Sequence, residues 1–396
     1  MADNIIVSGV GCCLVDILYN NIDFAGDAVR QYISKERGDG GLTPGKLVFQ
    51  EEFEQFSGIS LDNFIKKIAG GRNCDKINIG GPSIVSMINV AQLTSREKCE
   101  VYFYGRAGND DNGLYLITSL EKTPVVLKDF KLLKNCTPST MVLSDPLYDN
   151  GHGERMFINS IGAAWDFYPG ELDDDFFNSD IVVFGGTALV PNIHDHLTTL
   201  LKKAKSKGCI TIVNTVFDFR NEKSDPSKRW PLGEDDESYR LTDILITDKE
   251  EALGLSGESG IDEAVGFFLR KKVPSFIITN GSSDIITYSD GSFFTESPVN
   301  SLPVSLAVSN ELKSHSGGDT TGCGDNFVGC VIASVVNQLI SETGKPDMNE
   351  ACSWGIVSGG FACFYIGGTY FEKKPGEKTA RIKPYYDNYR EQISNG

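Results

Sequence analysis

The sequence predicts an α/β protein in which helices surround a mostly parallel central sheet, with a small second sheet beside it. Short runs rich in β-branched and aromatic residues alternate with helical stretches over most of the chain, which is typical of βαβ units. Two polar, glycine-rich segments, 17–50 and 123–165, interrupt this alternation. The 396 residues exceed the roughly 250–300 at which a single core stops growing, so we expect a large domain with a smaller module.

Each strand is predicted from a short apolar run. Buried strands are expected at residues 5–10, 101–104, 181–184, 209–213, 244–246 and 276–279. Helices are predicted where apolar residues recur three or four positions apart, as Ile84, Met87, Ile88 and Ala91 do. They are expected at residues 82–93, 114–120, 193–207, 249–256, 261–271, 327–340 and 351–365.

The two interrupting segments are predicted to form a small β lid. They are not helical, and segment 123–165 holds two strand-like pieces, so they can pair into a sheet over the crevice of the main domain. A third polar stretch, 221–239, has no periodicity and is predicted to be a surface insertion. The prediction is therefore one domain, residues 1–396, with a lid formed by residues 17–50 and 123–165.

Composition and charge argue against several classes of protein. Acidic residues number 54 and basic residues 37, which gives a net charge of −17, and so acidic a surface repels a nucleic-acid backbone. No apolar run reaches the ~20 residues that a membrane span needs, and the first residues lack the basic start of a signal peptide. The ten cysteines are scattered without a C-x-x-C pair, so we expect reduced thiols and a cytoplasmic protein.

The most informative stretch is the glycine-rich segment 317–329, which runs directly into an apolar helix. The N–H groups of Gly322, Cys323 and Gly324 are expected at the helix N-terminus, where unpaired donors and the helix dipole favour an anion such as phosphate. Asp325 follows in the first turn, where a carboxylate could take a proton from an attacking hydroxyl. The alternative is that Asp325 only caps the helix. There is no G-x-x-x-x-G-K-[ST] motif, so the segment is not a P-loop.

Six motifs occur in a characteristic order along the chain. The first five are Gly80-Gly81 with the end of its helix at 89–93, the glycine turn 105–113, Asp248-Lys-Glu-Glu251, Thr279-Asn-Gly281 and Asp319-Thr-Thr-Gly-Cys-Gly-Asp325. The sixth spans residues 367–375. In these motifs the sequence resembles the ribokinase-like (phosphofructokinase-B) carbohydrate kinases, a family that includes adenosine kinase. The motif ending at Asp325 is the most specific of them, and 367–375 is closer to adenosine kinases than to ribokinases.

The resemblance implies a three-layer α/β/α domain with a small β lid and transfer of the γ-phosphate of ATP, with Mg²⁺, to a hydroxyl. By the matching positions, Asp325 would be the general base, and Gly322, Cys323 and Gly324 would form the anion hole. Substrate contacts would come from Asp16, Gly80, Gly81 and Val85. ATP contacts would come from Thr279, Gly281, Asp319 and Thr320, and Mg²⁺ contacts from Glu251 and Asp248. Some relatives also bind a monovalent cation such as K⁺, beside positions that match Asp319 and Thr321.

Three positions depart from the family pattern. Val85 stands where the family carries an asparagine that contacts the sugar, so the acceptor cannot be copied from a relative. Asp248 replaces an asparagine near the metal and adds a negative charge. Asp284 replaces a glycine at the nucleotide edge, a milder change.

The expected function is an ATP-dependent kinase that phosphorylates a monosaccharide or related polyol. Two alternatives stay open: an adenosine or nucleoside kinase, and a catalytically silent regulator that binds a nucleotide or a sugar. Val85 is the one feature that favours the silent regulator, whereas the intact Asp325 and its glycines argue against it. The expected partner is a small-molecule substrate, not nucleic acid or membrane, and a homodimer is possible.

Overall fold

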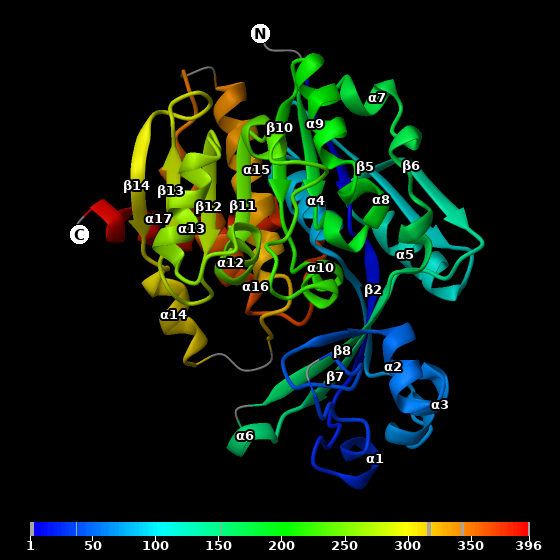
Figure 1. Ribbon diagram of the computed structural model, residues 1–396. Helices are drawn as coiled ribbons and strands as arrows, with labels where there is room; N and C mark the ends of the chain where they lie inside the picture. Colours follow the sequence, from blue (N-terminus) through cyan, green and yellow to red (C-terminus); the bar gives the residue numbers. More distant parts are fainter. Residues whose placement is uncertain (1–3, 37, 152, 315–317, 342–343, 395–396) are drawn as a thin grey trace.

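The computed structural model describes residues 4–36, 38–151, 153–314, 318–341 and 344–394. Its largest feature is a nine-stranded sheet with the order β14-β13-β12-β11-β10-β9-β1-β5-β6 (Figure 1). The strands are β1 (Ile5–Gly11), β5 (Cys99–Gly108), β6 (Val126–Leu133), β9 (Ile181–Gly185), β10 (Ile210–Asn214), β11 (Ile244–Asp248), β12 (Ser275–Thr279), β13 (Ile285–Ser289) and β14 (Ser297–Leu302). All pair in parallel except β13 and β14, which continue the sheet antiparallel at one edge.

Helices cover both faces of this sheet, so the predicted three-layer α/β/α fold is confirmed (Figure 1). One face packs on α4 (Pro82–Leu93), α5 (Asp111–Leu120), α15 (Cys323–Ile340), α16 (Met348–Ala362) and α17 (Glu377–Ser394). The other packs on α7 (Asp174–Phe177), α8 (Pro191–His194), α9 (Leu197–Ser206), α11 (Glu237–Leu241), α12 (Lys249–Ser256) and α13 (Ile261–Arg270). Strand β9 shows why: Ile181 and Val183 enter one core, and Val182 and Phe184 enter the other.

Every strand predicted for the main sheet is present, and most predicted helices differ only at their ends. The helix expected at 193–207 is divided into α8 and α9. The 221–239 stretch, predicted as a surface insertion, is partly buried instead, since Trp230 and Tyr239 are 3% and 0% exposed. That prediction was wrong because the stretch is polar on average but contains a few apolar residues that are buried. The Trp230 ring packs over Gly254, where a Cβ would come within about 2.5 Å of the ring.

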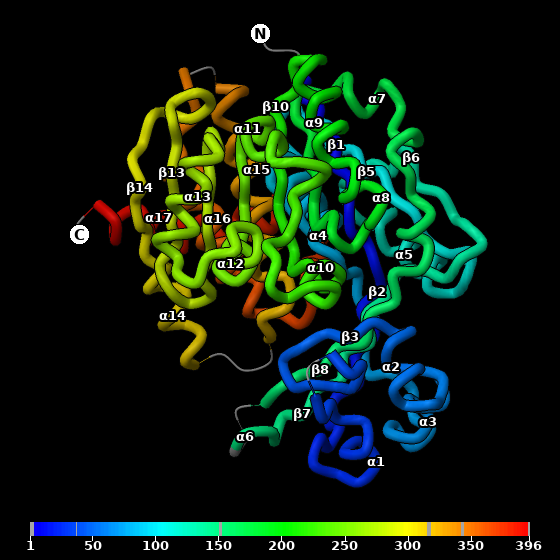
Figure 2. Tube along the Cα trace, viewed as in Figure 1, coloured from blue at the N-terminus to red at the C-terminus, as the bar shows by residue number. Residues whose placement is uncertain are grey.

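The small sheet lies apart from the large one, beyond the end of β1, and has the order β3-β8-β7-β2-β4 (Figure 1). Its strands are β2 (Leu14–Tyr19), β3 (Leu47–Phe49), β4 (Lys76–Gly80), β7 (Ser139–Asp145) and β8 (Glu154–Ser160). The helices α1 (Asp27–Arg30), α2 (Gln50–Ser57), α3 (Leu61–Ile68) and α6 (Tyr148–Gly151) accompany it. Figure 2 shows the chain passing from β1 straight into β2, so the small sheet is joined directly to an interior strand of the large one.

The small sheet takes strands from both predicted lid segments, 17–50 and 123–165, since β3, β7 and β8 lie within them, but its bounds differ from the prediction. It begins at Leu14 and takes in β4, which lies well beyond residue 50. Conversely, β6 falls inside 123–165 but pairs with β5 at the edge of the large sheet. Strand β6 carries Lys128, Asp129 and Lys131 and is buried at none of its residues, as an edge strand is, and the local pattern alone does not say which sheet such a strand joins.

Helix α15 is long and apolar enough, by length and composition alone, to cross a membrane. It instead lies at the centre of the domain, packed between α4 and α16, with 61% of the segment buried. The apolar surface of this helix is therefore accounted for by the protein core.

Candidate active site

A cavity of about 400 Å³, part of it open to solvent, lies between the two sheets. The residues that line it come from four strands of the small sheet, β2, β4, β7 and β8, and from two loops of the large domain. They are Asp16, Leu18, Asn78, Val142, Arg155, Phe157, Asp319, Thr321 and Gly367. Two of the predicted site residues, Asp16 and Asp319, therefore face the same space although they are far apart in the sequence.

The glycine-rich turn before α15 is built as the sequence predicts. Gly322 is the N-cap of α15 and adopts a left-handed conformation, φ 75°, in which a Cβ would overlap Gly368. The side-chain amide of Asn326 donates to the carbonyl oxygens of Gly322 (2.8 Å) and Gly368 (2.7 Å). These two hydrogen bonds fix the position of the turn. The N–H groups of the first turn of α15 lie at the helix N-terminus, where they have no acceptor in the preceding turn of a helix. A Cβ on Gly324 would meet nothing within 4 Å, so this side of the turn is open.

Two carboxyl groups at this site have strongly raised pKa values. Burial raises the pKa of Asp325 to about 7. Burial likewise raises the pKa of Asp16 to about 7, with the negative charges of Asp325 and Asp319 adding to the effect and Arg155 opposing it. A carboxylate with a pKa near the working pH is well suited to exchange a proton with a hydroxyl. Gly80 lies against it: a Cβ there would overlap the Asp16 carboxylate, so a larger residue would displace that side chain.

Arg155 connects the small sheet to the glycine-rich segment, and the sequence did not reveal it. From β8, its Nη1 donates to Thr321 Oγ1 at 2.8 Å, and its Nη2 lies 3.7 Å from Asp319 Oδ2. Asp319 is itself fixed, since its Oδ1 accepts from the N–H groups of Thr321 (2.9 Å) and Gly367 (3.2 Å). Arg155 belongs to no motif, and its position in a strand-like piece was the only available signal.

Asp248 and Glu251 meet at the end of β11, where they form a capping box on α12. Asp248 Oδ1 accepts from the N–H of Glu251 at 2.8 Å, and Glu251 Oε2 accepts from the N–H of Asp248 at 3.1 Å. Glu251 is buried and also accepts from the Thr215 hydroxyl at 2.5 Å. Burial, with a smaller contribution from Asp248, raises the pKa of Glu251 to about 7.

These two carboxylates are compatible with Mg²⁺ that is bound mainly through phosphates and water. Such a site needs only one or two protein carboxylates, and the side chain of Asp248 is exposed at the sheet edge. Within the described ranges, no three His, Cys, Asp or Glu side chains gather as a complete metal cage. The donor set therefore fits a metal shared with a nucleotide.

The remaining predicted positions lie in several places. Thr279 is the register partner of Asp248 on β12, and Gly281 follows it with φ 57° and open space around it, so the ends of β11 and β12 are adjacent. Thr320 is exposed on the glycine-rich segment. The first residue of that segment, residue 317, lies outside the described residues.

Gly81 and Val85 lie at the start of α4. Gly81 is its N-cap, with φ 102° and a Cβ position about 2.7 Å from the carbonyl oxygen of Cys12, so glycine is required there. Val85 is 2% exposed, packs opposite Gly368, and is not among the residues that line the cavity. Its role toward an acceptor stays a prediction.

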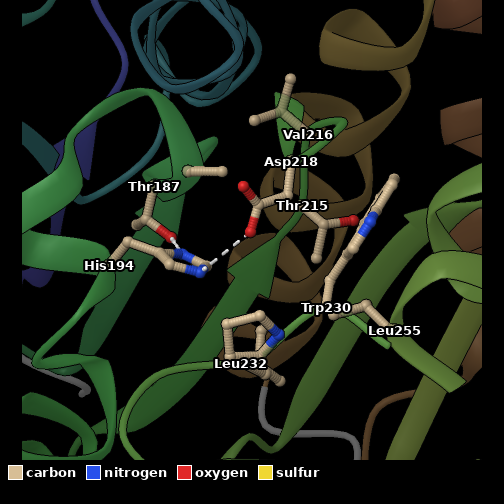
Figure 3. Close-up of a pocket in the computed structure, with 10 residues that line it drawn as sticks. Thr187, His194, Thr215, Val216, Asp218, Trp230, Leu232 and Leu255 are labelled. Carbon is tan, nitrogen blue, oxygen red and sulfur yellow. Dashed lines mark hydrogen bonds and ion pairs between the residues drawn. The ribbon is translucent and has the colours of Figure 1, made fainter. Parts of the chain in front are cut away.

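A second, smaller cavity lies at the ends of β9 and β10 (Figure 3). His194 is buried there, with Nδ1 2.9 Å from Thr187 Oγ1 and Nε2 3.6 Å from Asp218 Oδ2. His196 is exposed and contacts the Asn192 carbonyl, so the two histidines do not converge on a metal. Arg220 forms an ion pair with Asp195.

The α/β/α fold with a small second sheet, and a glycine-rich helix N-terminus next to two carboxyl groups, form the arrangement expected of a ribokinase-like kinase. The family model described as "pfkB family carbohydrate kinase" matches residues 78–374, and the chain belongs to that family. The predicted resemblance is confirmed. The match begins at 78, so the strand that carries Asp16 lies outside it. No curated protein matches the chain.

Solved structures with the same fold include both branches of this class. Adenosine kinase from Sinorhizobium meliloti is 18% identical with a TM-score of 0.69, covering 96% of this chain and 99% of its own. Adenosine kinase from Schistosoma mansoni, in complex with 2-fluoroadenosine, is 16% identical with a TM-score of 0.67, covering 94% and 98%. Ribokinase from Thermotoga maritima is 16% identical with a TM-score of 0.61, covering 97% and 99%. At these identities the comparisons establish the fold alone.

Proposed function

We propose that the chain is an ATP-dependent kinase that transfers the γ-phosphate to a hydroxyl of a monosaccharide or related polyol. The observation that carries this proposal is Asp325, a carboxyl group with a pKa near 7 in the first turn of α15, close to Asp16. A helix cap alone does not require a second carboxyl group, partly buried and close enough to feel its charge. One solved neighbour, from E. coli and 18% identical, is in complex with ATP and Mg²⁺, which supports ATP as the donor.

The residues divide the chemistry among them as follows. Asp16 accepts hydrogen bonds from acceptor hydroxyls and orients one of them. Asp325 takes the proton of that hydroxyl as its oxygen attacks. The N–H groups of residues 322–324 stabilise the charge on the transferred phosphoryl group. Asp248 and Glu251 would hold Mg²⁺, which neutralises phosphate charge. Thr279, Gly281, Asp319 and Thr320 would contact the nucleotide, and K⁺ near Asp319 and Thr321 is a separate, testable requirement.

A nucleoside acceptor is the second candidate, and one observation favours it. Gly367, the first residue of the segment that is closer to adenosine kinases, lines the cavity. Several fold neighbours are adenosine kinases. A catalytically silent regulator is the third candidate. A protein that catalyses no reaction does not need a carboxyl group such as Asp325, whose burial destabilises its charged form.

Release of ADP, measured with a panel of hexoses, pentoses, polyols and nucleosides, distinguishes the three candidates. A sugar or polyol as the best acceptor supports the proposal, and a nucleoside supports the second candidate. Binding of ATP without acceptor-dependent ADP release supports the regulator. Parallel assays with Na⁺, K⁺ and EDTA test the cation requirements. The proposal includes a small-molecule partner and a cytoplasmic location.

Activity is expected to depend on pH through Asp325. The group must be ionised to accept a proton, and burial raises its pKa to about 7. kcat/KM should therefore fall as the pH decreases below about 7 and reach a plateau above it. The measurement is the pH profile between 5 and 9 with saturating Mg²⁺; a flat profile would contradict the role of Asp325 as the base.

Closure of the small sheet over the acceptor is expected to be visible by hydrogen exchange. Arg155 is the contact between β8 and the glycine-rich segment, so segments 17–50 and 123–165 should exchange more slowly with acceptor and nucleotide both bound. Arg155→Ala should reduce that protection. Equal exchange rates in the free protein and the ternary complex would argue against closure.

Val85→Asn is expected to raise activity toward ribose-like acceptors, by supplying a hydrogen-bonding side chain where the wild type has none. In the wild type, adenosine and ribose should both be poor acceptors. The measurement is kcat/KM for adenosine, ribose and a hexose panel on both proteins. Adenosine as the best wild-type acceptor by a wide margin would refute the inference.

A further inference from the structure

Two thiols lie in contact behind the glycine-rich turn. Sγ of Cys323 and Sγ of Cys363 are 3.2 Å apart. Cys323 is the first residue of α15, and Cys363 is the C-cap of α16, so the pair joins the ends of two neighbouring helices. Both side chains are half-buried rather than sealed in the core, which leaves them within reach of a small oxidant.

The two thiols are placed as disulfide formation requires. A disulfide needs sulfur atoms about 2.05 Å apart, so an approach of roughly 1 Å closes the bond. The hydrogen bond between the thiols lowers the pKa of Cys363 and raises that of Cys323, so Cys363 is the better nucleophile of the two. If Cys363 is oxidised to a sulfenic acid, the neighbouring Cys323 thiol can react with it to form a disulfide.

We propose that Cys323 and Cys363 form a reversible disulfide that inactivates the site at the N-terminus of α15. The effect on catalysis rests on the proposed function, whereas the bond itself does not. With a peroxide as oxidant, Cys363 Sγ attacks one peroxide oxygen, the O–O bond breaks, and a sulfenic acid and one water form. Cys323 Sγ then displaces the hydroxyl as a second water. The two sulfurs lose two electrons to the peroxide, and their protons leave in the two waters.

A disulfide between Cys323 and Cys363 would disturb both the first turn of α15 and the glycine-rich segment that precedes it. Cys323 begins α15, and its N–H, which donates to the Thr320 carbonyl at 3.4 Å, is one of the proposed anion-hole donors. The chain at Cys363 lies against the glycine-rich segment. A Cβ on Gly318 would overlap the Cys363 carbonyl, and Asp319 N–H donates to the Tyr365 carbonyl at 3.2 Å. Drawing the two sulfurs together therefore shifts donors that a transferred phosphoryl group needs in place.

The test is oxidation of the whole protein with hydrogen peroxide, followed by peptide mass mapping and ADP-release assays. The expected result is a 323–363 cross-linked peptide with the mass of two hydrogens lost. Activity should fall about 10²-fold, the usual cost of misplacing a catalytic group by about 1 Å, and return with dithiothreitol. Cys363→Ser should keep its activity after peroxide. Cys136→Ser, which removes an exposed thiol elsewhere, should respond like the wild type.

The outcomes separate this inference from the proposed function. Failure of the cross-link to form, or a cross-linked protein with undiminished turnover, overturns the switch. If no acceptor supports ADP release by the reduced protein, the proposed function fails, and the switch is then judged by titration with a nonhydrolysable ATP analogue. Weaker binding by the cross-linked protein supports it, and equal binding by both forms overturns it.

Discussion

Asparagine in place of Asp325 is expected to lower kcat by about 10²–10⁴-fold, the usual contribution of a positioned base. The side chain keeps its size but no longer accepts the acceptor proton. ATP binding should survive, because the N–H groups of residues 322–324 belong to the backbone. The measurements are steady-state kcat with the best acceptor and calorimetric titration with ATP. Near-normal turnover would remove Asp325 from the mechanism.

The same variant has an expected effect on stability that a structural cap would not produce. Burial raises the pKa of Asp325 to about 7, whereas the unfolded chain releases the proton near the ordinary pKa of about 4. The folded state therefore binds more protons between these values, and this group makes the fold less stable as the pH rises from about 4 to 7. Asp325→Asn removes that penalty, so its melting temperature should exceed the wild-type value at pH 8 and approach it at pH 4.

Gly324→Val is expected to abolish phosphoryl transfer although it changes no charge. A Cβ at this position meets nothing within 4 Å, so the valine should be accommodated without disturbing the free protein. The open space that it fills is where a phosphate must approach the N–H groups of α15. The measurements are ADP release and ATP titration, together with thermal unfolding to establish that the variant is folded.

Gly170→Val is the matched control for this experiment. Gly170 is exposed on a short 3-10 turn (Pro169–Glu171), and a Cβ there likewise meets nothing within 4 Å. It lies far along the chain from the glycine-rich segment, and its variant should keep wild-type kinetics. Retained transfer by folded Gly324→Val would mean that the phosphates bind elsewhere. Equal losses in both variants would point to a general effect of valine on the fold.

The sequence by itself determined the features that depend on nearby residues. Apolar runs of three to six residues predicted most strands of the large sheet, because burial on both faces leaves little room for polar residues. The turn at Gly322 and the placement of Asp325 in the first turn of α15 follow from glycine conformation and helix geometry. The Asp248–Glu251 spacing matches the capping box that the structure contains, a local reading that the family motif had obscured.

Only the tertiary structure decided which distant residues share a site. Asp16, on β2, and Asp325 are brought close because α4 packs against both α15 and β1, the strand that leads into β2. Their raised pKa values exist only in that packed setting. Arg155 reaches Asp319 through the pairing of the small sheet, which also left β6 to the large one. Local sequence encodes the conformational preference of a segment, whereas its partners depend on the burial of surface contributed by the whole chain.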